Sequence, residues 1–178
     1  MWSKKLIDNL CGVCLVASEK IRHNDYLSDT VIFLYEHDEF GSKGVIINRV
    51  LDTKNLTGGD DFKGLVNLID KKDLGLLYFG PIASECFFVI KQKEYGYGFE
   101  CKLSASPVVS DNVVAVGVGN VVWGSGALLN DLRDGKWHIV NDDVGSVFEV
   151  AVDDRFDYAM SSLGVAVGSV FVDKVGNS

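Results

Sequence analysis

The chain has 178 residues, of which 47% are hydrophobic and 24% charged, with a mean hydropathy of +0.15. This apolar content argues against intrinsic disorder, and the length suits one folded domain over residues 1–178 rather than several. The formal net charge is -8, from 17 Lys+Arg against 25 Asp+Glu, so the average surface repels nucleic acid and direct nucleic-acid binding is disfavoured.

The first apolar stretch, Leu10–Ala17, contains two of the four cysteines, Cys11 and Cys14. Polar residues separate it from the preceding lysines and no small-residue cleavage site follows, so we expect no secretory signal and a cytoplasmic protein. No stretch reaches the ~20 apolar residues that span a bilayer, which predicts no membrane insertion. A C-x-x-C pair can serve redox chemistry at a helix start, but the apolar run that follows favours a buried strand with structural thiols.

The next two apolar runs predict a β-hairpin. Val31–Tyr35 and Gly44–Asn48 are rich in β-branched and aromatic residues, and the segment between them, Glu36–Lys43, is polar. Both runs are almost continuously apolar rather than alternating. We therefore expect both strands to be buried on two faces and the hairpin to lie near the centre of a sheet.

Further strands and helices follow in mixed order. The expected strands are Leu76–Phe79, Phe87–Lys91, Tyr97–Leu103, Val113–Val118, Trp137–Val140 and Val147–Val152. The expected helices begin near Phe62 after the caps Asp60 and Asp61, run from the cap Ser125 to Gly135, and run from the cap Asp154 to Gly164. Without a steady βαβ alternation, an α+β fold with a mixed or mostly antiparallel sheet is favoured over a Rossmann-like sheet.

The cofactor motifs that the chain approaches are incomplete. Gly117-Val118-Gly119 begins a dinucleotide-binding pattern, but Val122 stands where its third glycine belongs. Gly124-Ser125-Gly126 lacks the outer glycines of a nucleophile elbow. Cys86 and Cys101 are isolated, and no H-x-x-x-H pair completes a zinc site. We therefore expect no cofactor and no metal.

Two groups of residues allow more than one interpretation. Glu36-His37-Asp38-Glu39 could bind a metal, serve acid–base chemistry or line a polar pocket at the end of the hairpin. Neighbouring strand residues point to opposite faces, so hydrogen bonding across the hairpin loop is the favoured interpretation. Trp123 and Trp137 could line a ligand pocket, although aromatic residues among strands more often belong to the core.

Four blocks of sequence together resemble a known family. The most specific is Val31–Arg49, and the others are Leu10–Ala17, Tyr78–Ile82 and Trp123–Leu128. In this order, over about residues 6–165, they resemble the AlgH/YqgE family, with 166–178 as a tail. The resemblance implies one compact α+β domain with a twisted, mostly antiparallel sheet flanked by helices, a barrel-like sheet being one option. It also implies a bacterial, cytosolic protein of a family whose function is largely unassigned and for which transcriptional regulation has been proposed.

The chain departs from the family pattern in three places, one of which is the single glycine before Pro81 where the family commonly has two. Cys86 and Lys91 stand where the family usually has an arginine and a histidine, so an anion bound through that arginine would be lost. Between Leu103 and Val113 the family carries a helix of about three turns, and this chain has only Ser104–Asn112. That deletion would uncover one face of the domain.

These observations favour a non-catalytic domain that binds a protein partner or a small ligand, with regulation as the role that the resemblance adds. The candidate binding residues are Glu36, His37, Asp38, Asn48 and Arg49 around the hairpin end, with Trp123 if the fold brings the glycine-rich blocks together. The alternative is a hydrolase or metal-assisted enzyme that uses Glu36, His37 and Asp38.

Overall fold

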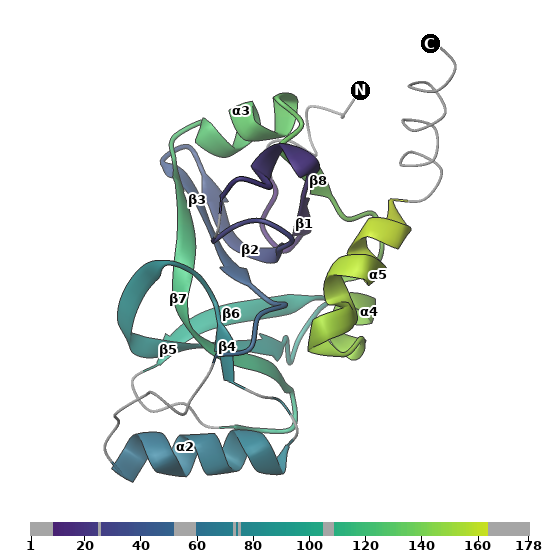
Figure 1. Ribbon diagram of the computed structural model, residues 1–178. Coiled ribbons are helices and arrows are strands. Elements are labelled where there is room, and N and C mark those ends of the chain that lie inside the picture. The colour runs from purple at the N-terminus through teal and green to yellow at the C-terminus, as the bar shows by residue number, and fades with distance from the viewer. Residues whose placement is uncertain are drawn as a thin grey trace.

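The structure is a computed structural model that describes residues 9–24, 26–51, 60–72, 74, 76–104 and 109–163, with the backbone alone at 60–62 and 82–86 (Figure 1). Its strands are β1 (Cys14–Ala17), β2 (Val31–Asp38), β3 (Gly41–Ile46), β4 (Leu76–Tyr78), β5 (Ile82–Gln92), β6 (Phe99–Ser104), β7 (Val113–Gly124) and β8 (Trp137–Ile139). Its helices are α2 (Asp60–Lys71), α3 (Ala127–Arg133), α4 (Val144–Glu149) and α5 (Arg155–Ser162), with 3-10 turns η1 (Glu19–Ile21) and η3 (Val152–Asp154).

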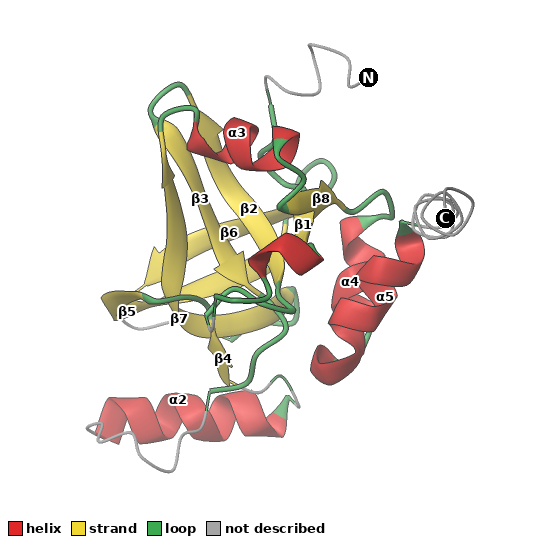
Figure 2. Ribbon diagram, turned by 45° about the horizontal axis from the view of Figure 1, so that its top comes forward, coloured by secondary structure: helices red, strands yellow, loops and turns green. Residues whose placement is uncertain are grey.

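The strands form one sheet in the order β6-β5-β7-β3-β2-β1-β8, with β4 beside β7. The described pairings are antiparallel except that of β4 with β7. The sheet curves strongly, but β6 and β8 stand at opposite ends of this order and no described pairing joins them, so the barrel is not closed (Figure 2). Helix α2 lies at one end of the sheet, α3 at the other, and α4 and α5 along one side (Figure 1). The α+β class and the mostly antiparallel sheet flanked by helices are confirmed.

The predicted hairpin is β2 paired with β3, and it lies in the interior of the strand order. Val31 and Phe33 belong to the hydrophobic cluster that packs against α4 and α5, whereas Ile32 and Leu34 belong to the cluster that includes residues of α3. All four side chains are buried. The predicted burial of this strand on both faces is therefore confirmed.

The hairpin is longer than its apolar runs suggest. β2 continues to Asp38 and β3 begins at Gly41, so only two residues turn between them. A Cβ at Gly41 would lie 2.3 Å from the carbonyl oxygen of Trp123, on the neighbouring strand β7. Glycine is therefore needed for β7 to approach the end of the hairpin this closely.

Strand β7 joins the two parts of the sheet. Its first residues pair with β4 and β5, and its last residues pair with β3. Between these parts Gly119 has a φ of 84°, a conformation that glycine adopts without strain. The sequence predicted only Val113–Val118, because two glycines interrupt the apolar pattern. The strand passes through Gly117-Val118-Gly119, so this motif is not a phosphate-binding turn.

The predicted strand Val147–Val152 is wrong. These residues form α4, which begins at Val144, and the turn η3. The side chain of Val147 is completely buried, and the ring of Phe148 lies 5.9 Å from that of Phe33 and 4.9 Å from that of Phe99. Packing against the sheet thus overrides the strand preference of a β-branched run.

Of the two predicted helix caps, Ser125 is wrong, whereas Asp154 occupies the N-cap position of α5 without a side-chain capping bond. The N-cap of α3 is Gly126 with a φ of 71°, while the hydroxyl of Ser125 donates to the carbonyl oxygen of Glu39, 2.6 Å away. Asp154 does precede α5, but its side chain makes no capping hydrogen bond, because η3 leads directly into the helix. Gly135 follows α3 with a φ of 68°, as its role in ending the helix predicts.

The two cysteines of the C-x-x-C pair lie in different surroundings. Cys14 is buried in β1, as predicted, and burial raises the pKa of its thiol to about 12. Cys11 is exposed in the turn before the strand, so the predicted buried position is wrong for it. Neither cysteine forms a disulfide.

The remaining predicted strands correspond to β4, β5, β6 and β8, within a few residues at their ends except that β5 begins earlier. The predicted caps at Asp60 and Asp61, the side chain of Cys86, the helix end at Gly164, the tail and part of Ser104–Asn112 lie outside the described residues or side chains. Among the described helices, none has the length and apolar character that crossing a membrane requires.

Candidate functional site

The three residues Glu36, His37 and Asp38, here called the hairpin-end residues, bond within the hairpin. Glu36 forms an ion pair of 2.9 Å with Lys43, which raises the pKa of that lysine. His37 Nδ1 shares a hydrogen bond of 2.7 Å with the hydroxyl of buried Ser42. The favoured interpretation, hydrogen bonding across the hairpin, matches these contacts.

Asp38 completes the end of the hairpin. Its carboxylate accepts hydrogen bonds from the backbone N–H groups of Phe40, at 2.8 Å, and Gly41, at 3.2 Å. These bonds hold the turn in the manner typical of aspartate. Within the described residues, no three His, Cys, Asp or Glu side chains lie close enough together to hold one metal ion.

Asn48 and Arg49 lie beyond the other end of β3, away from the hairpin-end residues, and they anchor the loop before β2. The side chain of Asn48 donates to the carbonyl oxygen of Asp29 and accepts from the N–H of Val31, both at 2.8 Å. Arg49 donates to the carbonyl oxygens of Tyr26 and, at 2.7 Å, Ser28. The two side chains therefore hold the backbone of residues 26–31 against the sheet.

Trp123 pairs with Ser42 across β7 and β3, so it lies near the hairpin end. Its ring contacts that of Trp137 edge to face, with centroids 5.9 Å apart. Trp137 reaches this position because β8 pairs with β1, where Ala17 is its partner. Both tryptophans are buried and belong to the same hydrophobic cluster, as the core interpretation predicted.

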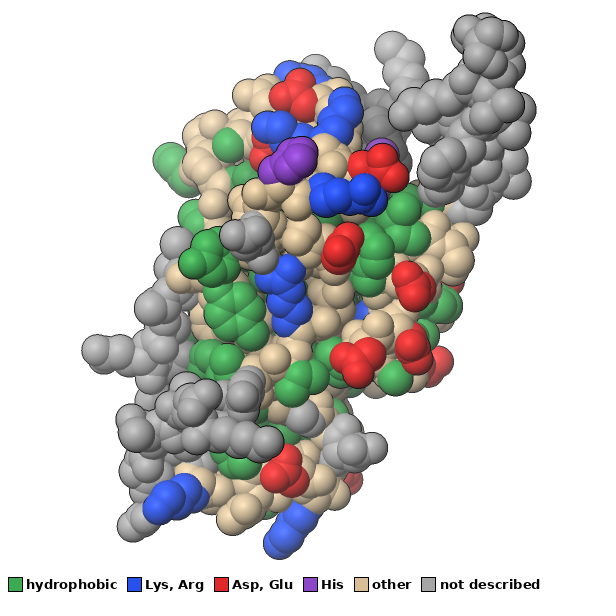
Figure 3. All heavy atoms as spheres, viewed as in Figure 1, with side chains coloured by type: hydrophobic (Ala, Val, Ile, Leu, Met, Phe, Trp, Pro, Cys, Tyr) green, Lys and Arg blue, Asp and Glu red, His purple; other side chains and the backbone are tan. Residues whose placement is uncertain are grey.

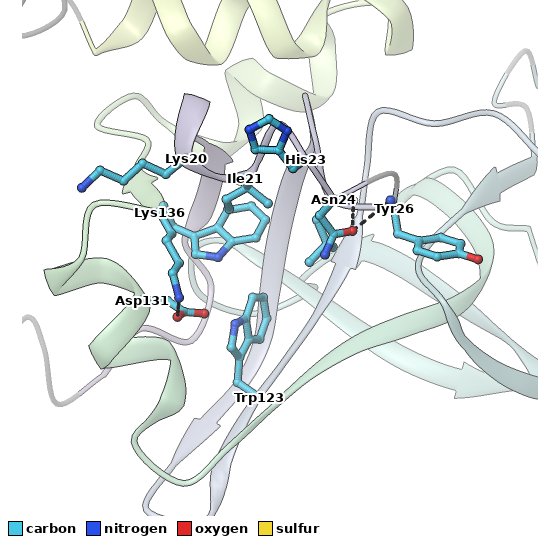
Figure 4. A pocket seen from close by; sticks show the side chains of 10 residues that line it. Lys20, Ile21, His23, Asn24, Tyr26, Trp123, Asp131 and Lys136 are labelled. Atoms are coloured by element: carbon cyan, nitrogen blue, oxygen red, sulfur yellow. Dashed lines mark hydrogen bonds and ion pairs between the residues drawn. The ribbon is translucent and has the colours of Figure 1, made fainter.

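The two tryptophans also form the floor of a cavity of about 610 Å³, here called the tryptophan cavity (Figure 4). The loop that Asn48 and Arg49 anchor forms one wall, and η1 and α3 form the others. The lining residues are Lys20, Ile21, His23, Asn24, Tyr26, Leu27, Trp123, Asp131, Lys136 and Trp137. Of the six predicted site residues, only Trp123 lines this cavity.

The indole N–H groups of both tryptophans lack a partner among the described residues. Trp137 is 2% exposed and Trp123 is 8% exposed, yet neither N–H donates a hydrogen bond within the described part of the chain. No described side-chain nitrogen is both inaccessible and without a partner, so each indole nitrogen must reach open space. The floor therefore presents two donors that no described residue satisfies.

Charged side chains stand on the cavity wall. Lys136 forms an ion pair of 2.8 Å with Asp131, which raises the pKa of the lysine. Lys20 donates to the carbonyl oxygen of Asp134. Burial lowers the pKa of nearby His138, and the Lys20 ammonium lowers it further. The chemistry available here is hydrogen-bond donation and positive charge beside an aromatic floor.

Comparison with known proteins decides the family. A family model described as AlgH-like (DUF179) matches residues 14–168. The chain belongs to the AlgH-like family. Its curated relatives include the UPF0301 protein NTHI0415 of Haemophilus influenzae, 26% identical over 189 residues, which cover 95% of this chain and 98% of the relative. A UPF0301 protein of Burkholderia cenocepacia is 28% identical over 181 residues, which cover 89% of this chain and 90% of the relative.

Two solved structures share the AlgH-like fold. The solution structure of AlgH from Pseudomonas aeruginosa matches with a TM-score of 0.63 and 20% identity, covering 90% of this chain and 92% of that chain. The crystal structure of DIP2367 from Corynebacterium diphtheriae matches with a TM-score of 0.62 and 16% identity, covering 90% and 94%. The resemblance to AlgH/YqgE is thus confirmed, and it identifies an uncharacterised bacterial family.

Most polar residues of the cavity in this AlgH-like chain were missed from the sequence. Lys20, His23 and Asn24 lie in a polar loop segment without a motif, and Lys136 follows a helix-ending glycine. The available signal was the pair Trp123 and Trp137, for which a ligand pocket was one of two interpretations. Only the pairing of β1 with β8 brings the two sequence regions together.

Proposed function

We propose that this chain is a non-catalytic binding domain whose small ligand occupies the tryptophan cavity. The observation that supports the proposal is the pair of tryptophans, Trp123 and Trp137, that line the cavity in edge-to-face contact and whose N–H groups have no partner in the described chain. Both N–H groups are accessible, so a ligand acceptor that takes the place of water there would bond to them. The cavity volume of about 610 Å³ suits a small molecule.

The six predicted site residues take different parts in this proposal. Trp123 contacts the ligand, and Asn48 and Arg49 position the wall by holding the backbone of residues 26–29. We assign the hairpin-end residues to closing the hairpin. Binding of a protein partner, and a role in regulation, would follow if ligand binding changes the surface formed by this loop.

The alternative of a hydrolase that uses Glu36, His37 and Asp38 has less support. Each of the three side chains already has a partner in the hairpin, and their strand positions alternate between faces. An esterase and phosphatase screen of the purified protein tests it. Turnover that is lost in a His37→Ala variant would favour the enzyme over the binding domain.

We also propose a cytoplasmic location. Cys11, Cys14 and Cys101 are all free thiols, which suits a reducing compartment. Fractionation of cells that express the tagged chain at native level tests this. Recovery in an oxidising compartment would contradict it.

The binding proposal is tested by nuclear magnetic resonance of the indole N–H groups. The chain has three tryptophans, so ¹⁵N-labelled protein gives up to three indole signals, which Trp→Phe variants assign. We expect the neutral probe 2-naphthamide to shift the signals of Trp123 and Trp137 in a saturable way, because its amide accepts from the cavity floor. Absence of saturable shifts with this probe and with its charged analogues would refute the proposal.

A further inference from the structure

We infer that the ligand of the tryptophan cavity is a flat, apolar molecule that carries an anionic acceptor group, a carboxylate or a phosphate. This inference rests on the proposed function and specifies its ligand. It follows from the unpaired polar groups, the local charge and the apolar floor of the cavity, and each of these is independent of the others.

The unpaired polar groups of the cavity are mostly donors. Besides the two indole N–H groups, the side-chain amide of Asn24 is available, because its oxygen already accepts from the N–H groups of Tyr26, at 3.0 Å, and Leu27, at 3.2 Å. The carboxylate of Asp131 is paired with the ammonium of Lys136, whereas the His23 ring and the Tyr26 hydroxyl can donate or accept. A ligand that satisfies this set must supply acceptors rather than donors.

The charge of the cavity differs in sign from that of the chain. The lining carries two ammonium groups, of Lys20 and Lys136, and one carboxylate, that of Asp131, although the whole chain has a net charge of -8. The carboxylate of Asp134 lies 4.0 Å from the Lys136 ammonium. Figure 3 shows basic and histidine side chains together with acidic ones at the α3 end of the molecule, whereas acidic side chains predominate over α4 and α5. An anion therefore meets a local attraction at the cavity that most of the surface does not offer.

The floor and one wall of the cavity are apolar. Trp123 and Trp137 meet edge to face, and Ile21 and Leu27 belong to the same hydrophobic cluster and also line the cavity. Tyr26, 60% exposed, stands at the rim. An aromatic or other planar body would stack here, and charged donors at the edge would bind its anionic group.

A series of probes with one ring and three charges tests the inference. The probes are 2-naphthoate, 2-naphthamide and 2-naphthylmethylammonium, titrated against the assigned indole signals at low ionic strength. We expect naphthoate to bind about 10-fold more tightly than naphthamide, and the cation to bind least tightly. Equal affinity of naphthoate and naphthamide would overturn the inference and leave the proposed function standing. If none of the three probes binds, both the inference and the proposed function are refuted.

Two lysine variants test whether the positive charges at the cavity attract the anionic group, and both leave the tryptophans in place. Lys20→Gln and Lys136→Gln should each weaken naphthoate binding about 3- to 10-fold, and each should weaken naphthamide binding by a smaller factor. Lys63→Gln, on the exposed face of α2, removes the same charge at the other end of the molecule and serves as the matched control (Figure 1). An equal loss in Lys63→Gln, or no loss in both cavity variants, would show that the cavity does not recognise the anion.

Discussion

Arg155 is a cation that the fold buries without a carboxylate partner among the described residues; it is 4% exposed. Its guanidinium donates to the carbonyl oxygens of Ile47, at 2.6 Å, and of Val150 and Phe148, at 3.1 Å. It also lies over the ring of Phe148, 5.4 Å from the centroid. Burial lowers the pKa of Arg155 to about 10, so the group remains charged at neutral pH. A single side chain thus joins α5 to the end of β3 and to the end of α4.

Replacement of this side chain should be costly. We expect Arg155→Met to lower the free energy of unfolding by about 3 kcal/mol, because three carbonyl groups lose a charged donor while the aliphatic stem is kept. Urea denaturation of both proteins measures the difference. Arg133→Met, which removes an exposed arginine from α3, is the control and should change stability by less than about 0.5 kcal/mol. Equal effects of the two variants would contradict this role of Arg155.

At the scale of elements, local sequence pattern predicts strands better than caps. The hairpin strands were predictable because continuous apolar runs require burial on both faces. Helix α4 was not predictable from the sequence. Val147 and Val150 favour a strand locally, and only the contacts of Phe148 with Phe33 and Phe99 select the helix. Ser125 failed as a cap for a similar reason, because its hydroxyl bonds to a residue that lies far away in the sequence.

The end of the hairpin gives a test at this scale. We expect Asp38→Ala to lower the free energy of unfolding by about 1 kcal/mol, because two backbone N–H groups lose their acceptor. Glu39→Ala changes the adjacent acidic residue in the turn and should have little effect, since its contact with Ser125 uses the backbone oxygen. Thermal denaturation measures both. A similar loss of stability in the two variants would refute the turn role of Asp38.

The Asp38→Ala variant also tests whether the hairpin end contributes to ligand binding in the cavity. Asp38 does not line the tryptophan cavity, so Asp38→Ala should bind 2-naphthamide within about twofold of the unchanged chain. A larger loss of affinity in a folded Asp38→Ala protein would show that the hairpin-end residues contribute to binding.

At the scale of the whole molecule, the fold depends on β7, which pairs with strands from both parts of the sheet. The general architecture was predictable from the mixed order of strands and helices. The cavity was not, because residues near position 20 meet residues near position 136 only after β1 and β8 have paired. Strand pairing between distant segments depends on the whole sheet, and no local pattern encodes it.

A glycine in this shared strand tests its role. Gly119→Ala should lower the free energy of unfolding by about 1–2 kcal/mol, because a φ of 84° strains any residue with a Cβ. Gly124→Ala, at the end of the same strand and with open space around its Cβ position, is the control and should be nearly neutral. Urea denaturation followed by tryptophan fluorescence and by circular dichroism measures both. Equal stability of the two variants would contradict the expected strain at Gly119. Different unfolding midpoints by fluorescence and by circular dichroism in Gly119→Ala would contradict unfolding as one cooperative unit.

The anchoring of the cavity loop has a consequence for evolution. Arg49 and Asn48 hold this loop through the carbonyl oxygens of Tyr26, Ser28 and Asp29, which every amino acid carries. Exchange of those side chains therefore leaves the anchoring bonds in place. Descendants of one ancestor could thus acquire new ligand preferences by point mutation in this loop while the frame around it stays the same.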